Sequence, residues 1–202
     1  MIKRCGVVVL FLLLTGGVFS QANPVLLGTE LQLVDRKLRT PGISPAERKQ
    51  ALVKMARLFE LSGNAEGAAE AWNQAARAIP GTVDQGALLR RAVFLAAMGE
   101  FEKAGTEVIP VLASPDPTLA VWARFLYAQC ESLRTGETGT LRVLLADPAL
   151  TEYKPAVYYS IWRISGDAAA RNRLTAEFPQ SPEARMALDN AAVSAAPTAL
   201  WL

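Results

Sequence analysis

The chain has 202 residues, of which 51% are apolar and 20% are charged, so it has the composition of a protein that buries a core. Its formal charge is +2, and Lys3 with Arg4 accounts for the excess, since the rest of the chain carries equal numbers of acidic and basic residues. A neutral chain offers nucleic acid no electrostatic attraction, so no nucleic-acid partner is expected. Histidine is absent, which excludes Ser-His-Asp and Cys-His nucleophiles and the commonest metal ligand.

The pattern of charged and apolar residues over residues 1–20 predicts a signal peptide. Lys3 and Arg4 form a positive start, residues 7–14 are an unbroken apolar run, and Val18 and Ser20 supply an aliphatic and a small residue at the −3 and −1 positions. We therefore expect cleavage after Ser20 and an exported, periplasmic protein with no stable membrane insertion after cleavage. The alternative is a retained anchor, for which the apolar run is short.

The pattern of residues 21–44 predicts an N-terminal segment that forms a helix. Apolar residues follow Pro24 at helical spacing, basic residues fill the last turn, and Thr40-Pro41-Gly42 ends the pattern. The next helix start is Ser44-Pro45-Ala46-Glu47, with serine at the N-cap, proline at the first position and glutamate at the third.

From residue 45 onward, helix-length apolar patterns alternate with brief breaks. Glycines mark several of these breaks, at Gly63, Gly99, Gly136 and Gly166. No segment has the sustained alternation of a strand, so the predicted fold class is all-α. Short breaks between helices of this length predict antiparallel hairpins.

Residues 49–82 carry large, small and turn residues at the spacing of a helical repeat: Leu52, Ala56, Phe59, Gly63, Ala68, Trp72, Ala75 and Pro80. This segment resembles the tetratricopeptide repeat, a helix-turn-helix unit in which small residues let two helices cross closely. A second copy starts at Gln85, with Arg91 at a place that is usually apolar, and two degenerate units follow. The resemblance implies a repeat domain over residues 45–190, built as a right-handed α-solenoid of antiparallel helical hairpins.

The resemblance also implies a concave surface lined by the first helix of each unit. The residues expected to line this groove and to bind a partner protein or peptide are Gln50, Val53, Arg57, Glu60, Leu61, Leu89, Val93, Ala96 and Ala97. The four residues of the second repeat, Leu89, Val93, Ala96 and Ala97, are more apolar than the others. They predict an apolar strip that receives an amphipathic helix or an extended peptide.

Other conspicuous side chains are interpreted as structural. Trp72, Trp122 and Trp162 fall at core positions, and Cys130 lies among apolar residues with no histidine to activate it. We expect the arginines of the repeats to lie on solvated faces or to form local ion pairs. We therefore expect no catalytic residue, no cofactor and no metal.

These patterns predict a non-enzymatic periplasmic scaffold or adaptor. The alternative is an accessory module of cell-envelope or peptidoglycan machinery, because residues 178–184 resemble the joints between repeats of bacterial envelope proteins. Residues 191–202 form an Ala/Pro linker-like tail ending in Leu200-Trp201-Leu202. Three interpretations of this apolar end stay open: it caps the last repeat, it docks into a partner, or it marks where a longer relative would continue into a glycan-binding domain.

Overall fold

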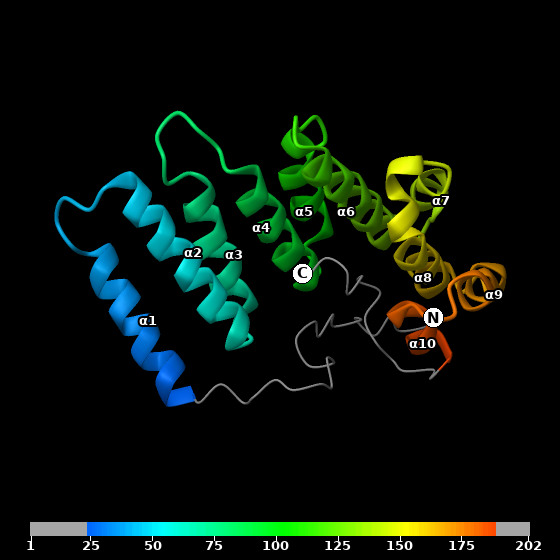
Figure 1. Ribbon diagram of the computed structural model, residues 1–202, viewed down its shortest axis with the longest axis horizontal. Coiled ribbons are helices and arrows are strands. Elements are labelled where there is room, and N and C mark those ends of the chain that lie inside the picture. Colours follow the sequence, from blue (N-terminus) through cyan, green and yellow to red (C-terminus); the bar gives the residue numbers. More distant parts are fainter. Residues whose placement is uncertain (1–23, 189–202) are drawn as a thin grey trace, which may run out of the picture. The chain divides into compact units, whose positions relative to one another are not determined.

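The computed structural model describes residues 24–188, which form helices and connecting turns with no strand in this range. The all-α prediction is therefore confirmed (Figure 1). The signal peptide predicted over residues 1–20 and the tail predicted over residues 191–202 lie outside the described residues. The chain divides into two compact units between Ser114 and Pro115, a boundary inside the region predicted as one repeat domain.

The first unit is a row of helices in which each packs mainly on its neighbour in the chain. The helices are α1 (Pro24–Leu38), α2 (Pro45–Leu61), α3 (Ala65–Ala76), α4 (Gln85–Ala97), α5 (Phe101–Val108) and the short 3-10 helix η1 (Ile109–Val111). Successive helices run in opposite directions because the connections between them are short (Figure 1).

Helix α1 confirms the helix predicted within residues 21–44. Its inner stripe consists of Leu27, Leu31, Val34 and Leu38, which recur at helical spacing and pack against α2. Gly42 ends the following turn with a φ of 77°, a backbone angle that glycine adopts without strain.

Helix α2 begins with the capping box predicted from its sequence. The Glu47 backbone N–H donates to Ser44 Oγ at 3.3 Å, and the Ser44 backbone N–H donates to Glu47 Oε2 at 3.2 Å. Pro45 occupies the first turn, where its missing N–H costs no helix hydrogen bond. The hydrogen bonds from Ser44 lower the pKa of the Glu47 carboxyl, which favours its charged form.

Fully buried alanines hold each hairpin of the first unit together. Ala56 on α2 and Ala68 on α3 are both 0% exposed, and Ala75 is 1% exposed. Ala92 on α4 and Ala104 on α5 are likewise 0% exposed. Small side chains therefore sit where the paired helices come closest, and the larger apolar residues pack around them.

The second unit gathers around one central helix. It contains α6 (Pro117–Thr135), α7 (Gly139–Leu144), the 3-10 helix η2 (Pro148–Tyr153), α8 (Lys154–Ser165), α9 (Ala168–Glu177) and α10 (Pro182–Leu188). Helix α8 contacts every other α-helix of the unit. It supplies Val157, Tyr159 and Ile161, each 0% exposed, to the core.

One arginine fastens the short helix α10 to its neighbours. Arg171 on α9 donates to the Ala187 carbonyl oxygen from Nη2 at 2.8 Å and from Nε at 3.2 Å. Its guanidinium carbon also lies 5.2 Å from the centre of the Trp162 ring on α8, within cation–π range. Arg171 therefore satisfies a carbonyl near the end of α10 that has no partner within the helix.

Within residues 24–188, no helix combines the length and the apolar character needed to cross a bilayer.

Candidate partner-binding surface

The predicted groove residues of α2 lie mostly at the surface. Gln50, Arg57 and Leu61 are exposed, Leu61 by 54%, and Val53 is half-buried. These four recur at a spacing that places them along one side of α2. Arg57 forms no ion pair with any other described residue. This side of α2 therefore offers apolar and cationic groups together.

Glu60, the fifth predicted residue on α2, is used within the fold. The indole N–H of Trp72 on α3 donates to Glu60 Oε1 at 2.6 Å. Trp72 is only 6% exposed, and a buried indole N–H needs an acceptor. Glu60 therefore stabilises the α2–α3 pair.

The predicted apolar strip on α4 is not available to a ligand in this structure. Leu89 is 4% exposed and Val93 is 8% exposed, while Ala96 and Ala97 are half-buried. The prediction of an exposed strip is therefore wrong for Leu89 and Val93. Helix α4 carries apolar side chains on nearly all its sides, which is typical of a helix that is buried all round: Ala87, Leu88, Leu89, Ala92, Val93, Phe94 and Leu95 are all buried.

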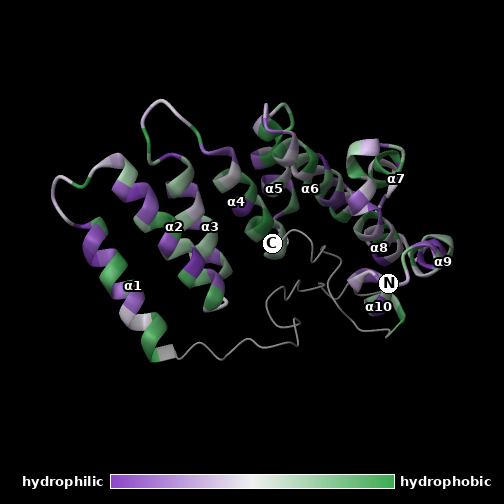
Figure 2. Ribbon diagram, in the orientation of Figure 1, coloured by the Kyte–Doolittle hydropathy of each residue, from purple (hydrophilic) through white to green (hydrophobic). Residues whose placement is uncertain are grey.

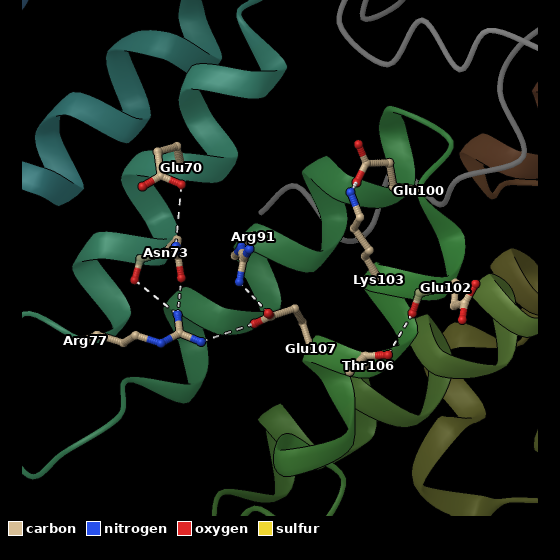
Figure 3. A network of polar contacts seen from close by, with 9 residues as sticks. All are labelled: Glu70, Asn73, Arg77, Arg91, Glu100, Glu102, Lys103, Thr106 and Glu107. Carbon is tan, nitrogen blue, oxygen red and sulfur yellow. Dashed lines mark hydrogen bonds and ion pairs between the residues drawn. The ribbon is translucent and has the colours of Figure 1, made fainter.

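A polar network connects α3, α4 and α5 (Figure 3). Arg91 of α4 pairs with Glu107 Oε1 of α5, and Nη2 of Arg77, the C-cap residue of α3, lies 3.8 Å from Glu107 Oε2. Arg77 also donates to Asn73, one turn earlier on α3, whose amide donates to Glu70. The side chains of Arg91 and Glu107 are only 21% and 19% exposed. These arginines therefore form local ion pairs, as predicted, and line no basic groove.

Arg124, an arginine of the second unit, is also paired. Arg124 on α6 pairs with Asp147, which lies just before η2. Its backbone-directed Nε–H donates to the Ala120 carbonyl oxygen at 3.4 Å. The second unit thus uses this charge to hold its own segments together.

Cys130, the cysteine in the described part of the chain, is unsuited to act as a nucleophile. The Cys130 side chain is 0% exposed, and burial raises the pKa of its thiol to about 12. A thiol with that pKa stays protonated at neutral pH and is a poor nucleophile. No group of three or more His, Cys, Asp or Glu side chains within the described part could hold a metal ion.

Sequence reasoning missed the outer side of α1. Val25, Leu26 and Leu33 are 73%, 63% and 47% exposed. In Figure 2 the first turns of α1 are largely apolar and its last turns largely polar. A signal for this surface was present, because the apolar residues of residues 24–38 exceed the single stripe needed to pack on α2.

Similarity to known proteins is confined to the second unit. A family model described as a middle domain matches residues 134–202, less than half of the chain. The described part of this range begins in the last turns of α6 and includes α7 to α10. No curated protein and no solved structure matches the chain. The exposed sides of α1 and α2 lie outside the matched range.

Proposed function

We propose that this chain is an exported, non-enzymatic scaffold or adaptor of the tetratricopeptide-repeat type, which binds a protein or peptide partner through its first unit. The observation that carries the proposal is the pair of hairpins, α2–α3 and α4–α5, closed over fully buried alanines. Helices of this kind cannot bury their apolar faces singly, so they stack. Stacked hairpins leave long surfaces that suit peptide segments.

The chemistry of the surface supports binding of a protein. Gln50, Arg57 and Leu61 present an amide, a guanidinium and an apolar side chain on one side of α2. Arginine flanking apolar groups is a combination enriched in protein interfaces. The lack of histidine and the buried thiol of Cys130 support a role without catalysis.

The proposed location rests on residues 1–20, whose pattern of charge and apolar residues is that of an export signal. Periplasmic scaffolding agrees with the neutral charge of the remaining chain, which favours neither nucleic acid nor an anionic membrane surface. In this proposal the repeats form a right-handed α-solenoid.

Site-specific crosslinking tests the proposal. A photoreactive residue is placed at Gln50 in the full chain, which is expressed in a bacterial host, and adducts are identified by mass spectrometry. A matched control carries the same residue at Val143, which is 73% exposed in the second unit. We expect a discrete protein adduct at position 50 that is missing at position 143. The absence of an adduct at position 50, and equally at Arg57 and Leu61, would overturn the proposed function.

A further inference from the structure

Exposed side chains on α1 and α2 form two stripes of matching spacing. On α1 the stripe consists of Leu26, Glu30 and Leu33. On α2 it consists of Lys54, Arg57 and Leu61. Residues separated by three, four or seven positions lie on the same side of a helix, so each stripe runs along one side of its helix.

An ion pair joins the two stripes. Lys54 Nζ lies 2.5 Å from Glu30 Oε2. The two helices pack directly on one another and run in opposite directions (Figure 1). The stripes therefore lie side by side, and Leu26 lies toward the same end of the hairpin as Leu61. We call these six residues the α1–α2 surface.

The α1–α2 surface is apolar with an excess of positive charge. Leu26, Leu33 and Leu61 are 63%, 47% and 54% exposed. Glu30 and Lys54 neutralise each other, which leaves the charge of Arg57 without a counterion among the described residues. Lys37, one turn beyond Leu33, adds a second positive charge at the far end of the stripe, where the Glu47 carboxylate is near enough to feel part of that charge.

Helix α1 is the first helix of the row among residues 24–188, and its outer side has no described neighbour beyond it. The end helix of a stacked repeat normally presents a polar outer face to water. Exposed leucines at this place therefore point to a covering partner. Two separated positive charges favour a partner that carries carboxylates.

Resting on the proposed function, we infer that the α1–α2 surface is the docking site for an acidic amphipathic helix of the partner. From Leu26 to Lys37 the stripe is about 16 Å long, which is about three helical turns. Such a helix lays its leucines over Leu26, Leu33 and Leu61. Its carboxylates reach Arg57, which lies between Lys54 and Leu61 on α2, and Lys37, which lies one turn beyond Leu33 on α1.

The test uses the full chain and two synthetic helical peptides labelled with fluorescein. One peptide has leucines on one face flanked by glutamates, and its matched control has lysines in place of the glutamates. Fluorescence anisotropy at low salt measures both affinities. We expect the acidic peptide to bind at least about tenfold more tightly than the basic one, because charge complementarity selects the partner.

Single variants locate the site. Arg57→Glu is expected to weaken binding of the acidic peptide by about tenfold and to strengthen binding of the basic peptide. Leu61→Ser should also weaken binding of the acidic peptide. Val83→Ser should leave this binding unchanged, although Val83 is 56% exposed in the same unit. Circular dichroism confirms that each variant keeps its helix content, as expected for exposed positions.

Equal affinity for the two peptides would overturn the inference, and so would equal effects of Leu61→Ser and Val83→Ser. Binding to phosphatidylglycerol vesicles that exceeds binding to the acidic peptide would assign the surface to a membrane and overturn it as well. A dimer in light scattering that Leu26→Ser dissociates would assign it to a second copy of this chain. An adduct at Gln50 without any preference for the acidic peptide would refute this inference and leave the proposed function standing.

Discussion

Enlarging Ala68 should destabilise the protein strongly, because the α2–α3 pair has no room at this position. Ala68 and its counterpart Ala56 are both 0% exposed. Ala68→Leu adds an isopropyl group between two packed helices, which forces them apart or pushes side chains out of their preferred rotamers. Overpacking of a well-filled core typically costs about 1–3 kcal/mol, and the upper end applies where no route to solvent exists.

A loss of about 3 kcal/mol should lower the melting temperature by about 6–12 °C, since each kcal/mol corresponds to about 2–4 °C in chains of this size. Thermal melts followed by circular dichroism measure the change. The matched control is Ala46→Leu, the same substitution at an exposed position in the first turn of α2. Surface substitutions of this kind stay within about 0.5 kcal/mol, so this melt should hardly move.

If Ala68→Leu melted at the same temperature as Ala46→Leu, close packing at the helix crossing could not be what holds the hairpin together. The repeat interpretation would then lose its physical basis. Retained helix content with a lower melting temperature is the outcome that supports it.

Three further predictions concern the interior of the two units. Leu89→Glu should unfold the first unit and reduce soluble yield, since an unpaired buried carboxylate costs several kcal/mol; a folded, stable variant would show that Leu89 is accessible after all. Glu107→Gln should lower the free energy of unfolding, measured by urea unfolding, by about 1 kcal/mol, because it leaves two arginines facing each other. Lys103→Gln, which removes a more exposed ion pair, should have no measurable effect. Cys130 should resist maleimide at pH 8 until the chain is unfolded by urea, because burial raises its pKa. Since that pKa is raised from 9.0 to about 12, the thiol's contribution to stability is complete below pH 9 and is lost as pH rises toward 12; rapid native labelling would contradict this account.

Local chemistry explains why so much of the fold could be predicted. The start of α2 depends on Ser44, Pro45 and Glu47, which interact only with one another and with their own backbone. The ends of the hairpins depend on glycines such as Gly63 and Gly99, whose φ values of 75° and 82° exclude most other residues. Signals that act over a few residues are readable without knowing the rest of the structure.

The candidate site depends on which side of each helix is covered, and a repeat pattern alone does not determine this. The repeat pattern predicts an open surface at Leu89 and Val93 by analogy between α4 and α2, whereas both side chains are buried. The two helices differ, because α2 has exposed polar residues along one side and α4 has apolar residues nearly all round. Periodicity within α4 itself indicated full burial.

The leucines of α1 were missed for a related reason. The sequence pattern of this segment predicts a helix but not which of its two sets of apolar residues packs on α2. The ion pair between Glu30 and Lys54 joins residues far apart in the sequence, and no local rule relates them.

Because Arg171 contacts both α10 and Trp162, detachment of α10 should be visible in tryptophan fluorescence. One guanidinium holds the carbonyl of Ala187 and lies against the indole of Trp162. Helix α10 has only seven residues and would not persist by its own hydrogen bonds, and its detachment requires release of that carbonyl. Because the same movement changes the surroundings of an indole, fraying at this end should alter tryptophan emission while the core around Tyr159 remains closed.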